Sequence, residues 1–215
     1  MKDAWYGDNK DLVKWSILAQ LATKYKTPRI VYAAYYRPSV WSPLDIDGHP
    51  YRIPVGVITH FRDIHKITTM NAGLQINLIG NVFANRAQYT QGIIGAIGAP
   101  GTGPCIVFLD PDIGLEPGRP RPEHVLVSEV SAVWNAMRPY DLLSFFQHRT
   151  NRKGAPWIGA KRKQLAGAIG LSPSAVKVAK GPRIAPDVVL FYCQKRVLKR
   201  NQRSITNQQA IAGEG

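Results

Sequence analysis

Cysteine is scarce in this chain of 215 residues: there are two, and both lie inside apolar runs. So few cysteines exclude a disulfide-rich secreted domain, and these two lack the close spacing that a structural metal site requires. We therefore expect Cys105 and Cys193 to be reduced, buried thiols.

Long hydrophobic runs are also missing. No stretch approaches the roughly 18 consecutive apolar residues of a membrane-spanning helix, so we expect no membrane partner. Residues 1–5, MKDAW, lack the apolar core of a signal peptide. Together with the cysteine usage, these absences predict a cytoplasmic protein.

Acidic residues are few as well: 14 Asp and Glu stand against 28 Lys and Arg, a net charge of +14. Residues 149–203 hold fourteen of these bases and one acid, Asp187. Concentrated positive charge attracts polyanions, so we predict a nucleic-acid partner, either DNA or RNA. A solvated basic face is the alternative. The expected nucleic-acid contacts are Arg149, Arg152, Lys153, Lys161, Arg162, Lys163 and Lys177.

The clearest pattern lies in residues 105–117, CIVFLDPDIGLEP. Residues 105–109 form a continuous apolar run that is typical of a buried parallel strand. Asp110 and Asp112 follow at its carboxyl end, which is where open α/β sheets bind ligands. The alternative is that these acids cap a helix or form a turn beside Pro111.

Strand and helix signals alternate along the chain. Apolar runs predict strands at residues 29–36, 55–59, 105–109, 141–147 and 187–194, with a loop at 37–51. Helical spacing predicts helices at residues 11–24, capped by Asp8 or Asn9, at 122–137 and within 85–97, while 74–83 fits a strand or a helix. This order predicts one α/β domain over residues 1–198, with a doubly wound, mostly parallel sheet. The polar segment 199–215 is expected to be a disordered tail.

Residues 161–180, KRKQLAGAIGLSPSAVKVAK, carry a separate signal. Ser172 and Pro173 suit the start of a second helix after the turn at Gly170. The spacing fits a helix-turn-helix unit inserted between the last strands, whose second helix would carry Lys177 toward a groove. The alternative is an ordinary pair of connecting helices.

Two chemistries fit the acids at the end of the central strand. Asp110 would accept hydrogen bonds from an amino group and position its nitrogen for attack on a methyl donor. Alternatively, Asp110, Asp112 and Glu116 would hold Mg²⁺ or Mn²⁺, with His148 as acid or base for phosphodiester cleavage. A non-catalytic nucleic-acid-binding protein is the third possibility.

Residues 6–21, YGDNKDLVKWSILAQL, resemble the AGNHADVLKH-type opening of the large-subunit ribosomal RNA adenine-N6 methyltransferase family. In that family a strand follows this helix and a later strand ends in Asp-Pro-Pro-Tyr. Residues 29–36 and 107–111 occupy those places here. The resemblance implies a Rossmann-like methyltransferase fold, S-adenosylmethionine as cofactor, and Asp110 as the residue that engages an exocyclic base amine. It places Asn9 and Lys14 near the cofactor.

The chain departs from the family pattern in two places. Residues 35–38, Tyr-Tyr-Arg-Pro, contain no glycine where the family has an acidic, glycine-rich cofactor loop. Asp112 and Ile113 replace the second proline and the aromatic residue on which a flipped base would stack. The prediction is therefore an atypical nucleic-acid methyltransferase with Asp110, Asp112 and His148 in its site, and with its oligomeric state open.

Overall fold

The computed structural model describes residues 7–37, 42–61, 64–70, 72–100, 103–150 and 156–196. The predicted tail, together with Arg152 and Lys153, lies outside these ranges. Within them, no helix has the length and apolar character needed to cross a bilayer.

A six-stranded sheet in the order β4-β1-β5-β8-β10-β9 forms the centre of the molecule. Its strands are β1 (Arg29–Ala33), β4 (Gln75–Ile79), β5 (Ile106–Leu109), β8 (Leu142–His148), β9 (Lys177–Ala179) and β10 (Val188–Gln194). Strands β4, β1, β5 and β8 pair in parallel, whereas β10 pairs antiparallel with both β8 and β9. The predicted α/β class with a mostly parallel sheet is confirmed, and 74–83 contains a strand.

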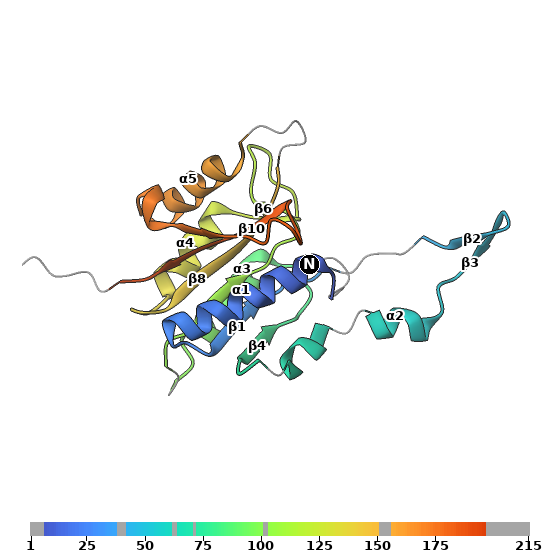
Figure 1. Cartoon of the computed structure of the whole chain (residues 1–215), viewed down its shortest axis with the longest axis horizontal. Helices are drawn as coiled ribbons and strands as arrows, with labels where there is room; N and C mark the ends of the chain where they lie inside the picture. The colour runs from blue at the N-terminus through green and yellow to red at the C-terminus, as the bar shows by residue number, and fades with distance from the viewer. Residues whose placement is uncertain are drawn as a thin grey trace, which may run out of the picture.

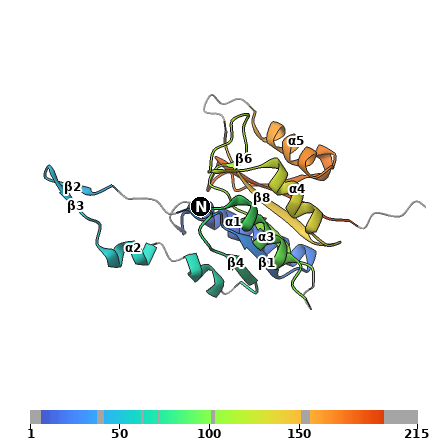
Figure 2. The ribbon, with the colours of Figure 1, turned by 180° about the vertical axis from the view of Figure 1, so that it is seen from behind.

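Helices cover both faces of this sheet (Figures 1 and 2). The helices are α1 (Asn9–Tyr25), α2 (Val55–Phe61), α3 (Arg86–Ile97), α4 (Val127–Ala136) and α5 (Ile158–Ala168), with 3₁₀ turns η1 (Ile64–Thr69) and η2 (Pro173–Ala175). Because side chains alternate along a strand, Val107 and Leu109 of β5 join the core under α3, α4 and α5. Ile106 and Phe108 join the core under α1 and η1. The sheet is therefore doubly wound, as predicted.

Helix α1 follows its sequence signals closely. The Asp8 side chain accepts hydrogen bonds from the backbone N–H groups of Lys10 and Asp11, which makes it the N-cap. On the buried side of α1, the Trp15 ring meets the edge of Tyr32 at 5.1 Å between ring centroids. The apolar stripe thus fixes α1 across the centre of the sheet.

The direction in which successive strands are added to the sheet reverses between β1 and β5. From β1 it passes outward to β4, and it then returns to place β5 on the other side of β1. In open α/β sheets, the crevice outside the carboxyl ends of the strands at such a switch point is the usual place for a ligand. Tyr32 on β1 and Asp110 after β5 lie at this point.

Two predictions for residues 37–59 are wrong. Residues 55–59 form part of helix α2 rather than a strand, because Pro54 begins a turn in which its carbonyl accepts from Val57 and Ile58 N–H. The predicted loop contains a hairpin of β2 (Leu44–Ile46) and β3 (His49–Tyr51). Asp47 and Gly48 both have positive φ there, as a two-residue hairpin turn requires.

The predicted second helix after residue 171 is also absent. Helix α5 ends before Gly170, which has a φ of 66°. Pro173 begins only the short turn η2, and residues 177–179 then pair with β10 as strand β9. The helix-turn-helix unit and the ordinary pair of connecting helices are therefore both wrong for these residues. Likewise, the helix predicted at 122–137 begins at Val127, because β7 (His124–Val125) pairs with β6 (Gly114–Leu115).

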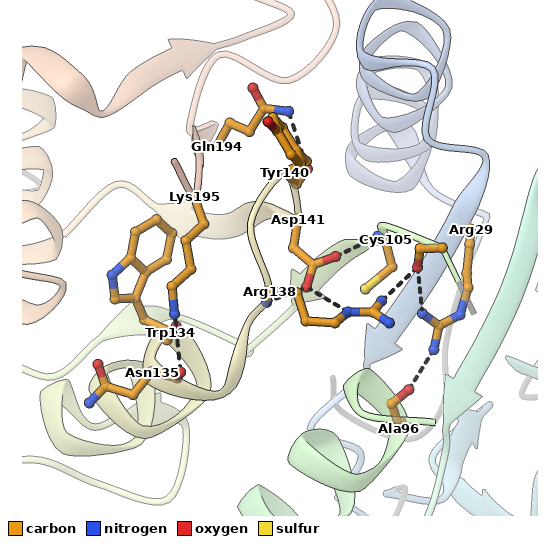
Figure 3. Close-up of polar contacts among 11 residues, drawn as sticks. Arg29, Ala96, Cys105, Trp134, Asn135, Arg138, Tyr140, Asp141, Gln194 and Lys195 are labelled. Carbon is orange, nitrogen blue, oxygen red and sulfur yellow. Dashed lines mark hydrogen bonds and ion pairs between the residues drawn. The ribbon is translucent and has the colours of Figure 1, made fainter. Parts of the chain in front are cut away.

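Buried polar groups close the amino edge of the sheet (Figure 3). Asp141, which is 0% exposed, accepts hydrogen bonds from the backbone N–H groups of Cys105 at 2.7 Å and Arg138 at 2.6 Å. The guanidinium groups of Arg138 and Arg29 both donate to the carbonyl of Gly103, at 2.6 and 3.5 Å. These contacts join the starts of β1, β5 and β8.

We predict that Asp141→Ala lowers the free energy of unfolding by about 3 kcal/mol, because it leaves buried donors without an acceptor. Asp141→Asn should cost less, since its carbonyl still accepts from Cys105 N–H. Urea unfolding of the two variants and the parent protein measures the difference. Equal losses for Ala and Asn would contradict the buried acceptor role.

Candidate functional site

Charged and polar side chains gather at the carboxyl edge of the sheet, on the face that α1 covers. We call them the carboxyl-edge cluster. Its members are Lys10, Asp11, Lys14, Tyr32, Asp110, Asp112, His148 and Asp187. They come from α1, from β1, from the loop after β5 and from the ends of β8 and the segment before β10. The cluster includes three residues that the sequence predicted for catalysis.

Lys14 is the buried cation of this cluster. Its Nζ donates to Asp11 Oδ1 at 2.6 Å and to Asp110 Oδ2 at 2.9 Å, and it lies 4.8 Å from the centroid of the Phe146 ring. Burial alone would lower the pKa of Lys14, but the charges of Asp110 and Asp11 raise it above its ordinary value. Lys14 is therefore a permanent ammonium ion whose hydrogen bonds hold two carboxylates.

Asp110 is the acid that Lys14 and Tyr32 both contact, and it is 2% exposed. Its Oδ2 accepts from both Lys14 Nζ and Tyr32 Oη, each at 2.9 Å. Both of the hydrogen bonds that it accepts from described residues go to this one oxygen. Burial raises the pKa of Asp110, while the Lys14 charge opposes that rise. Oδ2 is thus fixed by donors from α1 and β1.

His148 lies at the end of β8, next to Asp187. Its Nδ1 is 3.6 Å from Asp187 Oδ2, which is 3.4 Å from Lys10 Nζ. Burial, together with the positive charge of Lys10, lowers the pKa of His148 to about 4. Asp187 raises this pKa, but by less than Lys10 lowers it. The imidazole is therefore neutral at neutral pH and can accept a hydrogen bond.

Asp112 is held by the segment that follows β1. Arg37 donates to Asp112 and, at 3.2 Å, to Glu123. Burial would raise the pKa of Asp112, but neighbouring positive charge, including the Arg37 guanidinium, lowers it overall. Arg37 therefore anchors the Asp110–Asp112 turn.

The turn after Asp112 is positioned by Gln147, which is fully buried. Its Oε1 accepts from Leu115 N–H at 2.9 Å, and its Nε2 donates to the carbonyls of Ile113 and His148 at 3.1 and 2.9 Å. Gly114 has a φ of 130°, and a Cβ there would lie 2.3 Å from the Gln147 amide. Gln147 and Gly114 therefore fit together and fix the backbone next to Asp112.

The acids predicted to hold a metal ion are not brought together. Glu116 Oε1 accepts from Val127 N–H at the start of α4, on the other face of the sheet from Asp110. In the part of the chain that the structure describes, no three His, Cys, Asp or Glu side chains are arranged to hold a metal ion. The alternative based on Asp110, Asp112 and Glu116 is not formed.

The predicted nucleic-acid contacts differ in their exposure. Lys161 is 9% exposed, and its Nζ donates to the carbonyls of Leu115 and Glu116 at 2.8 and 3.1 Å. Its ammonium group therefore stabilises strand β6. Arg162 is half-buried, while Arg149, Lys163 and Lys177 are exposed.

Tyr32 and Asp187 of the cluster, and Arg37, which binds the cluster member Asp112, were not among the predicted site residues. Tyr32 belongs to an apolar strand, and no sequence pattern other than its hydroxyl group marked it as a site residue. Arg37 and Asp187 lie far along the chain from Asp112 and His148. Asn9, predicted to lie near a cofactor, is exposed in the first turn of α1, next to Lys10. Its neighbour, rather than Asn9 itself, makes the ion pair with Asp187.

No family model and no curated protein sequence matches this chain. Among solved structures, it is similar to an O-methyltransferase family protein from Burkholderia thailandensis, with a TM-score of 0.43 and 12% identity. The alignment covers 89% of this chain and 59% of that protein, so this chain spans less than two thirds of its length. At this level of identity, the likeness says nothing about what this chain acts on.

We predict that Gly114→Ala destabilises the protein by about 2 kcal/mol or more, because the added methyl group meets Gln147 and the backbone has positive φ. In a Gln147→Ala background the same substitution should cost less, since the steric part is removed. A double-mutant cycle on the free energy of unfolding measures this coupling. Additive effects would show that the two residues do not constrain each other.

His148 should make the protein less stable in acid. In the unfolded chain a histidine ionises near pH 6.5, whereas in the folded chain the pKa of His148 is about 4. As the pH falls between these values the unfolded state binds the proton first, so stability on the order of 2 kcal/mol is lost. His148→Asn should flatten this part of the pH profile of the unfolding free energy, and His49→Asn in the exposed hairpin should not. An unchanged profile in His148→Asn would contradict the buried neutral imidazole.

Proposed function

We propose that this chain is an S-adenosylmethionine-dependent methyltransferase that acts on an exocyclic base amine of nucleic acid. The proposal rests on the position and the hydrogen bonds of Asp110. This acid lies at the switch point of the sheet, and the hydrogen bonds that it accepts from Lys14 and Tyr32 both go to Oδ2.

Holding one oxygen of Asp110 gives the other a defined direction. An amine that donates an N–H to Oδ1 is oriented with its nitrogen lone pair turned toward a methyl donor. The charge of Lys14 favours the ionised carboxylate despite its burial. The neutral imidazole of His148 supplies a second acceptor in the same cluster, either for the other N–H or for the proton that the methylated amine releases.

The cofactor would supply an electrophilic methyl group. Its methionine part is a zwitterion, which needs partners of both signs, and the carboxyl-edge cluster offers them in partly exposed side chains. Lys10 and Asp187 are 35% and 42% exposed, in contrast to the buried pair of Lys14 and Asp110. We therefore expect Lys10 and Asp187, rather than Lys14, to hold the amino-acid end of the cofactor.

Arg149 is the predicted nucleic-acid contact that lies closest in sequence to the site. It is exposed and directly follows His148 at the end of β8. Its backbone N–H donates to the carbonyl of Asp187 at 2.7 Å, which fixes the backbone beside the cluster. A phosphate bound by Arg149 would bring an adjoining base toward Asp110.

We predict that Asp110→Asn retains S-adenosylmethionine binding but loses about 100-fold or more in methyl transfer to RNA or DNA oligonucleotides. An amide at this position has a weaker acceptor and no charge to orient the amine. Calorimetric titration measures cofactor binding, and incorporation of a labelled methyl group measures transfer.

Lys10→Ala should instead weaken cofactor binding in the same titration. Lys163→Ala, on an exposed lysine of α5, is the matched control.

Thermal unfolding of each variant establishes that it is folded. If the parent protein binds neither S-adenosylmethionine nor S-adenosylhomocysteine, with or without nucleic acid, the cofactor assignment is overturned. Nucleic-acid binding that weakens steeply with salt, without methyl transfer, would identify a non-catalytic binding protein. Full activity in Asp110→Asn would remove Asp110 from the reaction.

A further inference from the structure

Residues 42–61 form an arm that extends away from the sheet (Figures 1 and 2). The arm consists of the β2–β3 hairpin and helix α2, and it is inserted between β1 and β4. Each hairpin strand has three residues, and the helix has seven. Two-stranded hairpins and helices of this length are marginally stable in water, so they need packing partners.

The arm exposes an unusual number of apolar side chains. Of residues 42–60, only Ile53 and Ile58 are half-buried, and the others are exposed. The large exposed apolar residues of the arm are Leu44, Ile46, Tyr51, Val55 and Val57, from 44% to 78% exposed. Such a concentration marks an interaction surface rather than the scattered apolar residues of an ordinary protein surface.

The charge of the arm argues against nucleic acid as its partner. The hairpin carries Asp45 and Asp47, and between residues 42 and 61 the only Lys or Arg is Arg52. Phosphate groups would be repelled by the acidic turn. The arm instead suits an apolar protein surface with positive charge at its border.

The body of the same chain has a surface of this kind. A groove of about 410 Å³ lies between α1 and residues 179–184, lined mainly by apolar side chains that include Val13, Ile17 and Ile184. Lys24 and Lys180 also line it, and both are exposed. None of its lining residues is acidic. The groove therefore complements the arm in both apolar character and charge.

We propose that the arm of one copy of this chain docks into the α1 groove of a second copy. Ile46 and its apolar neighbours fill the groove, and the acids of the hairpin turn face Lys24 and Lys180. A second copy is the partner because the arm of each chain points away from its own body (Figures 1 and 2). The proposal does not depend on methyl transfer, since neither surface contains a member of the carboxyl-edge cluster.

Sedimentation equilibrium of the full chain across the micromolar range tests the proposal. The parent protein should be an oligomer, and Ile46→Glu on the arm and Ile184→Glu in the groove should each raise the dissociation constant by about tenfold or more. Val82→Glu is the matched control, because Val82 is 49% exposed and belongs to neither surface. Circular dichroism confirms that each variant is folded.

A charge exchange tests the pairing itself. Lys180→Glu should weaken association, because the new carboxylate would face Asp45 and Asp47 of the docked hairpin. Adding Asp47→Lys to the same chain should restore association. Mixing an Ile46→Cys chain with an Ile184→Cys chain under mild oxidation should give a disulfide between chains, since the native Cys105 and Cys193 are buried. A monomeric parent, an oligomer unaffected by Ile46→Glu, or failure of the exchange to restore association would overturn the proposal.

Discussion

The ion pair between Lys14 and Asp110 is the contact on which this face of the molecule depends. It joins α1 to the end of β5, and Tyr32 adds β1 through the same carboxylate oxygen. Lys14 also binds Asp11 within α1. A buried pair of this kind is not a large source of net stability, but losing one partner leaves an uncompensated charge. The position of α1 and the ionisation of the candidate site are therefore parts of one arrangement.

The buried centre of the fold could be predicted from the sequence because burial leaves a local pattern. The strands at 106–109, 142–148 and 188–194 are apolar runs with buried side chains. Helix α1 has an apolar stripe and an N-cap at Asp8. Asp110 could be found for the same reason, since a charged residue directly after a buried strand stands at a sheet edge.

The errors lie where tertiary context decides the structure. Residues 55–59 have the β-branched composition of a strand, but all except Ile58 are exposed and they begin after Pro54, so backbone hydrogen bonds within a short helix replace sheet pairing. Residues 177–179 form a strand because they pair with the edge of β10. The partners of the site, Arg37 for Asp112 and Tyr32 for Asp110, lie 75 and 78 residues away, which no local pattern can reveal.

The two edges of the sheet use similar groups to different effect. At the amino edge, Asp141 is fully buried and accepts two backbone N–H groups, so its bonding capacity serves the ends of the strands. At the carboxyl edge, Asp110 accepts from described residues through one oxygen, His148 is kept neutral, and the Lys10–Asp187 pair is partly exposed. A carboxylate held in a fixed direction is what the proposed transfer to an amine requires. The proposed reaction therefore depends on the carboxyl edge, although ionisable side chains stand at both edges.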